Sequence, residues 1–159
     1  MVACADGTTL SFKGGKDRVN MNAKGKTREN SISTHNHPES IIKGDILHTV
    51  FSGSDIEVFR DMKEYGKRMN SIENGKRKTV MLIKTAKTTQ ENVSDFTSHI
   101  LSKEKSMMET INLSFKDYKD NKISYKQYRD KSNSAIKNYE KEFEKKSKKY
   151  NMIYIKEYL

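Results

Sequence analysis

The most regular hydrophobic pattern lies in the second half of the chain. Between residues 88 and 118, apolar side chains recur at spacings of three, four and seven, from Val93 through Ile100 to Tyr118. Such spacing places these side chains on one face of an α-helix. The pattern therefore predicts a long amphipathic helix.

A second helix is predicted after a polar break at residues 120–122. Ser124 is its predicted N-cap, and Gln127, three residues later, is the predicted partner in a capping box. Two amphipathic helices joined by a short turn predict an antiparallel helical hairpin. The apolar segment 152–159 that follows predicts either a strand or a helix that packs against the rest.

In the first half, short runs alternate between apolar and polar residues, as half-buried β-strands do. Residues 8–12 and 17–21 lie on either side of a Gly-Gly pair, which predicts a β-hairpin. Residues 31–35 predict a further strand. It runs into Pro38, the only proline in the chain, which ends it.

A helix is predicted after the loop that follows this strand. Ser54 or Asp55 predicts its N-cap, because both side chains can accept a hydrogen bond from the first turn. Apolar side chains at Ile56, Phe59 and Met62, and further on at Tyr65 and Met69, form a stripe that predicts an amphipathic helix, although Gly66 weakens its end.

The Asn-Gly pair at 74–75 is a strong hairpin signal between strands predicted at residues 71–72 and 79–84. Together the elements predict an α+β fold. It consists of a small mixed or antiparallel sheet with a packed helix over residues 1–85, followed by a helical hairpin extension over residues 86–159.

Composition and charge narrow the class of protein. Apolar and charged residues each make up 33% of the 159 residues, which predicts a compact core with highly solvated helices. The net charge is +10, but it is spread evenly: residues 1–85 hold 15 basic and 10 acidic side chains, and residues 86–159 hold 16 and 11. Nucleic-acid binding is therefore possible but expected to be unspecific.

Cysteine usage and hydropathy exclude several classes. Cys4 is the only cysteine, which excludes an intrachain disulfide and a cysteine-based zinc cluster. No run of 18 apolar residues occurs, so the sequence predicts no membrane span. A cytoplasmic location, in a bacterial host cell or with a virion, is the expectation.

The candidate chemistry centres on two histidines at the end of the predicted strand. His35 and His37 are two residues apart, so in an extended chain their imidazoles project to the same face. A catalytic zinc site commonly has three protein ligands and an open fourth position. Asp55, at the start of the next helix, can return to this face and supply the third ligand.

These residues resemble a known family. The pattern His-x-His-Pro at 35–38, followed by Ser-x-x-Asp at 52–55, is similar to the JAB/MPN (JAMM) metalloprotease domain. More narrowly, THNHP and FSGSDI resemble the JAB-like domains found with phage head-morphogenesis proteins and with some bacterial toxins. The resemblance covers about residues 1–85.

The resemblance implies a set of roles. His35, His37 and Asp55 would be the zinc ligands, although another divalent ion is possible. Ser52 would stabilise the oxyanion or orient the bound water. The family also uses an upstream glutamate as general base, which has no counterpart on a predicted strand here. Either the chain begins after it, or a group such as Glu39 replaces it, or the site binds metal without turnover.

Two functions follow as expectations. The first is a zinc-dependent peptidase or isopeptidase that acts on a protein or peptide, in phage head morphogenesis or against a host protein. The second is a catalytically inactive JAB-type binding or assembly module, which recruits a protein or nucleic acid through its basic surface and helical tail. The oligomeric state is not predicted.

Overall fold

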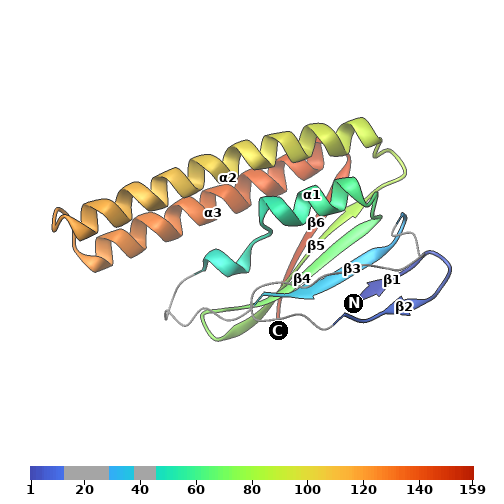
Figure 1. Cartoon of the computed structure of the whole chain (residues 1–159), viewed down its shortest axis with the longest axis horizontal. Helices are drawn as coiled ribbons and strands as arrows, with labels where there is room; N and C mark the ends of the chain where they lie inside the picture. The colour runs from blue at the N-terminus through green and yellow to red at the C-terminus, as the bar shows by residue number, and fades with distance from the viewer. Residues whose placement is uncertain (13–28, 38–45) are drawn as a thin grey trace.

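The computed structural model describes residues 1–12, 29–37 and 46–159. In this part of the chain a six-stranded mixed sheet, in the order β2-β1-β3-β4-β5-β6, carries its helices on one face, so the fold is α+β as predicted (Figure 1). The elements are β1 (Val2–Ala3), β2 (Thr9–Leu10), β3 (Ile32–Asn36), the 3-10 turn η1 (Leu47–Thr49), α1 (Gly53–Asp61), β4 (Gly66–Glu73), β5 (Lys76–Lys84), α2 (Gln90–Lys119), α3 (Tyr125–Lys149) and β6 (Met152–Tyr158).

The unit that positions the candidate site is the β3–α1–β4 crossover. Strands β3 and β4 are parallel, with His35 opposite Met69, whereas the other neighbouring strands are antiparallel. A connection between parallel strands must cross over the sheet, and here α1 makes that crossing. The predicted strand at 31–35 is confirmed, shifted by one residue.

The predicted helix is wrong in the second half of its apolar stripe, which runs from Ile56 to Met69. Helix α1 ends at Asp61, and Lys63 then adopts a left-handed backbone conformation with φ of 50°. The chain turns there and enters β4. Met69 is fully buried as an inward-facing residue of that strand. Its burial therefore comes from the sheet and not from a helical stripe with Ile56 and Phe59.

The N-terminal hairpin also differs from the prediction. Residues 9–10 pair antiparallel with β1, so that Val2 lies opposite Leu10. The turn between them contains Gly7 with φ of 82°, a conformation that glycine adopts without strain. The partner predicted at residues 17–21 lies outside the described residues.

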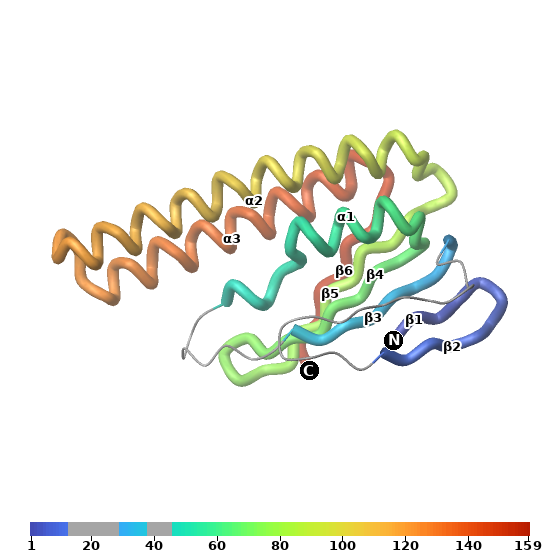
Figure 2. The backbone as a smooth tube through the Cα atoms, viewed as in Figure 1, coloured from blue at the N-terminus to red at the C-terminus, as the bar shows by residue number. Residues whose placement is uncertain are grey.

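The predicted helical hairpin is confirmed, and it packs on the sheet. Helices α2 and α3 lie side by side, and their tip extends past the sheet (Figures 1 and 2). Phe143 of α3 is central to the contact: its ring lies 5.7 Å from that of Phe51 and 5.1 Å from that of Phe96. Residues on both sides of position 85 thus share one hydrophobic core.

The segment after the hairpin forms an edge strand. Strand β6 pairs antiparallel with β5, with Tyr154 opposite Leu82. The tube in Figure 2 shows the chain returning from α3 to lie along β5. The last strand of the sheet therefore comes from beyond the helices.

Two lysines are buried on the helix-facing side of the sheet. Lys67 and Lys78 are each 1% exposed. Lys67 forms an ion pair with Glu64, and Lys78 lies 2.8 Å from Glu140 and 3.1 Å from Glu73. A charged side chain can be buried in this way because a carboxylate of opposite charge lies beside it.

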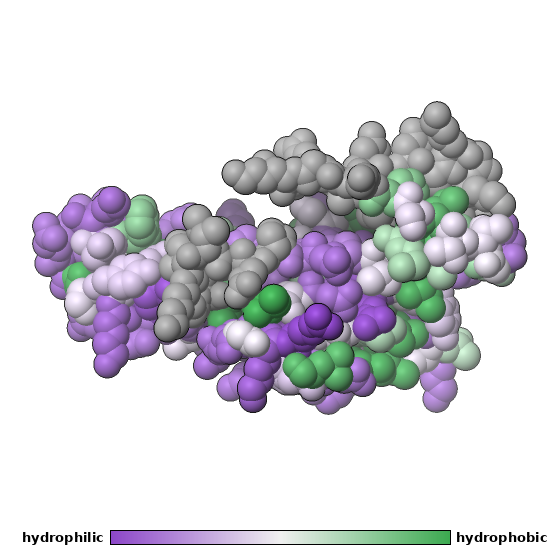
Figure 3. All heavy atoms as spheres, turned by 90° about the horizontal axis from the view of Figure 1, so that it is seen from below, coloured by the Kyte–Doolittle hydropathy of each residue, from purple (hydrophilic) through white to green (hydrophobic). Residues whose placement is uncertain are grey.

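The surface differs between the sheet and the hairpin. Seen from below, apolar surface gathers over part of the sheet, whereas the projecting hairpin is mainly hydrophilic (Figure 3). Among the described residues, none of the helices combines the length and apolar character that a membrane span requires.

Candidate metal centre

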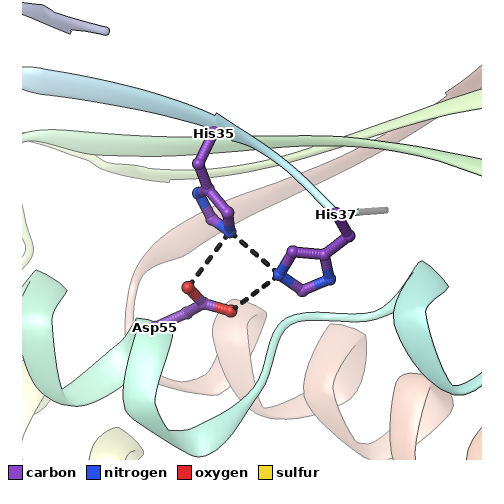
Figure 4. A group of neighbouring side chains, drawn as sticks. All are labelled: His35, His37 and Asp55. Atoms are coloured by element: carbon purple, nitrogen blue, oxygen red, sulfur yellow. Dashed lines mark hydrogen bonds and ion pairs between the residues drawn. The ribbon is translucent and has the colours of Figure 1, made fainter. Parts of the chain in front are cut away.

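Two histidines and one aspartate converge between β3 and α1 (Figure 4). His35 lies on β3, and His37 follows it, with its backbone N–H donating to Asn70 of β4 at 2.8 Å. The Nε2 atoms of the two imidazoles are 3.1 Å apart, and His35 Nε2 is also 3.1 Å from Asp55 Oδ1. The three predicted ligands are therefore together.

Helix α1 holds Asp55 through its first turn. Ser52 is the N-cap, which corrects the predicted cap at Ser54 or Asp55, and Asp55 is the third helical residue of a capping box. Both the backbone N–H and the hydroxyl of Ser52 donate to Asp55 Oδ2, at 2.9 and 2.8 Å. Oδ2 is thus engaged by the helix terminus, while Oδ1 faces His35.

The backbone orients the imidazole ring of His37. Its Nδ1 lies 3.0 Å from the carbonyl oxygen of His48. A carbonyl oxygen only accepts hydrogen bonds, so Nδ1 donates to it, and Nε2 is the ring nitrogen that faces Asp55. Histidines that bind metals are oriented by a second hydrogen bond of this kind.

The electrostatic environment keeps the carboxylate ionised. Burial alone would raise the pKa of Asp55, but hydrogen bonds from His35 and His37, together with the charge of Lys67, hold it well below its usual range. The side chains of the three candidate ligands are still 15–18% exposed. An ion from solvent can therefore reach an anionic ligand without complete opening of the fold.

The spacing of the three side chains is compatible with one bound metal ion. Zinc binds nitrogen and oxygen ligands at about 2.0–2.1 Å, which places neighbouring ligand atoms about 3.3 Å apart. The two Nε2 atoms are 3.1 Å apart, and each histidine approaches a different oxygen of Asp55: His35 lies 3.1 Å from Oδ1 and His37 lies 3.5 Å from Oδ2. Within the described residues, these three side chains form one group whose ligand atoms all lie within 4.8 Å of one another.

The other predicted site residues have different outcomes. Glu39 lies outside the described residues. Ser52 lies beside the ligands, with its hydroxyl on Asp55, and its catalytic role stays a prediction. His48 has an exposed side chain and contributes its backbone carbonyl to His37.

Sequence reasoning missed the charged pair next to the centre. Glu64 is fully buried, accepts a hydrogen bond from Ser33 on β3 at 2.9 Å, and pairs with Lys67. Ser33 and His35 point to the same face of β3. The alternation of polar residues along β4 gave no signal that Lys67 faces inward.

Comparison with known proteins adds no relationship. A scan against protein-family models, a search of curated proteins and a search of solved structures each gave no match. The geometry of the centre and the residues around it are therefore the structural basis for a function.

Proposed function

We propose that His35, His37 and Asp55 bind one divalent metal ion, in the first place zinc, and that the protein is a metal-dependent hydrolase of peptide or isopeptide bonds. The observation that carries the proposal is the convergence of two Nε2 atoms and a carboxylate oxygen at ligand spacing. The hydrogen bond between His37 Nδ1 and the His48 carbonyl, which orients the ring, supports it independently.

Each residue of the centre would have a distinct role in metal binding and hydrolysis. The two imidazoles and Asp55 hold the ion and leave a position for a further ligand. A bound zinc ion would supply Lewis acidity for the hydrolysis of a carbonyl compound. Ser52 keeps Asp55 in its orientation. The similarity of the two motifs to JAB-type domains selects a protein or peptide as substrate, and a cytoplasmic or virion-associated setting.

A second function is favoured by one observation. Within the described residues, no glutamate joins the three ligands, and Glu64, the buried carboxylate nearby in the fold, is held by Ser33 and Lys67. A metal-stabilised binding or assembly module without turnover is therefore the alternative, with a protein or a nucleic acid as its partner.

Metal analysis tests the site. Wild-type protein incubated with zinc and then dialysed should retain about one equivalent, measured by mass spectrometry, and His37→Ala should lose it. His48→Ala is the matched control, because its side chain is exposed and only its carbonyl contacts the centre. Wild-type protein that retains no zinc would refute the site.

A second assay separates the two functions. The zinc-loaded wild type should cleave an isopeptide-linked or extended peptide substrate, and Asp55→Ala should not. Zinc retention without any cleavage, together with salt-dependent binding of a nucleic acid, would favour the binding module.

A further inference from the structure

The helical hairpin contacts the metal-ligand helix on both sides of its N-cap. The Tyr139 hydroxyl of α3 donates to the carbonyl oxygen of Phe51 at 3.0 Å. Glu104 of α2 accepts from the backbone N–H of Gly53 at 2.8 Å. Ser52, which binds the Asp55 carboxylate, lies between these two points. Both contacts therefore fix the short segment that orients a metal ligand.

Gly53 permits the close approach of Glu104. A Cβ atom at this position would overlap the Glu104 carboxylate and would lie 2.6 Å from Leu101 Cδ2. With only hydrogen atoms at this Cα, the carboxylate of α2 reaches the N-terminus of α1. The glycine and the glutamate are 51 residues apart.

The first turn of a helix has backbone N–H groups without partners inside the helix, and this helix end satisfies three neighbouring N–H groups. The Ser52 N–H binds Asp55 Oδ2, the Asp55 N–H binds Ser52 Oγ, and the Gly53 N–H binds Glu104. Without Glu104, the Gly53 N–H would attract the other anion at this terminus, which is Asp55. The carboxylate would then be drawn from the histidines.

The hydroxyl of Tyr139 stays protonated and can therefore donate a hydrogen bond. Burial, together with the nearby charges of Glu104 and Asp55, raises the pKa of its hydroxyl above the usual value. The side chain is 3% exposed and belongs to the hydrophobic core, so its hydroxyl has a fixed position. The carbonyl of Phe51 is thus anchored to the hairpin.

We propose that Glu104 and Tyr139 are positioning residues for the metal ligand Asp55, so that the helical hairpin sets the metal affinity of the centre. This inference depends on the proposed metal site. Neither residue touches the ion: both act through the backbone on either side of Ser52. Mutating the outer partners of metal ligands commonly changes affinity by about 10- to 100-fold. Because Glu104 and Tyr139 act one step further out, we expect the lower end of this range.

The test measures cobalt(II) affinity by absorption titration at 25 °C, where each variant is shown to be folded by circular dichroism. Glu104→Ala should bind cobalt about tenfold more weakly than wild type. Glu104→Gln keeps an acceptor oxygen and should recover part of the loss. Glu109→Ala is the matched control, because Glu109 is an exposed glutamate of the same helix, and its affinity should equal that of wild type.

Two further variants keep the test decisive if Glu104→Ala does not fold. Tyr139→Phe removes only the hydroxyl and should weaken cobalt binding about threefold. Gly53→Ala improves helix propensity but displaces the Glu104 carboxylate, so it should also weaken binding. Its effect should be smaller when Glu104 is already alanine, because only the contact with Leu101 then remains, and a double-mutant cycle would show the difference.

The outcomes separate the two proposals. If wild-type protein binds no cobalt or zinc, the proposed function fails and this inference fails with it. If wild type binds metal and the Glu104 and Tyr139 variants bind equally tightly, only the inference fails. A lower melting temperature with unchanged affinity would show a purely structural role and would also overturn it.

Discussion

Replacing Lys78 by methionine should remove the central cation of a buried network. The ammonium group is 1% exposed and lies between Glu140, at 2.8 Å, and Glu73, at 3.1 Å. Methionine keeps an unbranched chain of similar length, so the substitution deletes charge with little change of volume. Two largely buried carboxylates then lose their counter-ion.

The magnitude follows from this arrangement. Removing one partner of a buried ion pair costs about 3–5 kcal/mol, and the carboxylates here keep 12–13% exposure, so the loss should be about 3 kcal/mol at pH 7. In a chain of this size such a loss lowers the melting temperature by about 6–12 °C. Lys156→Met is the matched control. Lys156 also contacts Glu140 but is 35% exposed, and its loss should be below about 1 kcal/mol.

The loss should also depend on pH. Burial raises the pKa of Glu140, but hydrogen bonding and charge from Lys78 outweigh it, and the net pKa lies below the usual value. A lowered carboxyl pKa stabilises the fold above the unfolded value of about 4.3, and this contribution is lost as the pH falls. Without Lys78, burial favours the neutral acid. The difference between wild type and Lys78→Met should therefore shrink between pH 7 and pH 4.

Urea unfolding followed by circular dichroism at both pH values measures this difference. Equal losses at pH 7 and pH 4 would refute the electrostatic reasoning. A loss at pH 7 no larger than that of Lys156→Met would refute the assignment of Lys78 as the buried cation of the network.

Three further predictions concern separate parts of the fold. Ser52→Ala should lower stability by about 1 kcal/mol and weaken zinc retention, because it removes the helix cap and a hydrogen bond to Asp55. Ser54 is an exposed neighbour, so Ser54→Ala should do neither, and equal effects of the two substitutions would contradict the assigned cap. Phe143→Ala should cost about 3–5 kcal/mol in a single unfolding transition, whereas two separate transitions would show that the hairpin folds independently of the sheet. Gly75→Ala, with φ of 78° in the β4–β5 turn, should cost about 1 kcal/mol by denaturant unfolding, and a neutral result would contradict the left-handed turn.

Local sequence patterns were enough to predict most of the secondary structure and the three candidate metal ligands. The apolar spacing and the Ser124 capping box located the two long helices, and the extended His-x-His segment indicated that two imidazoles share a face. These signals depend on residues within one or two turns of each other. That is why the sequence alone contains them.

The missed features depend on contacts between distant segments. Helix α1 ends because Lys63 turns left-handed, without a glycine to signal it at that position. Lys78 looks like a solvated residue of β5, since its partner Glu140 lies on α3. In the sequence, Glu104 resembles any surface glutamate of a helix. Its contact with the Gly53 N–H exists only because α2 packs against the start of α1. Only the tertiary arrangement gives these residues their roles.

The origin of β6 has a consequence for the order of assembly during synthesis. When β5 has left the ribosome, its outer edge has no neighbour, and Phe51 has neither the Phe143 ring nor the Tyr139 hydroxyl that will hold it. Both arrive only with the helices and the strand beyond them. The ligand-bearing segment should therefore reach its final geometry late, and metal capture should follow completion of the C-terminal half rather than nucleate folding.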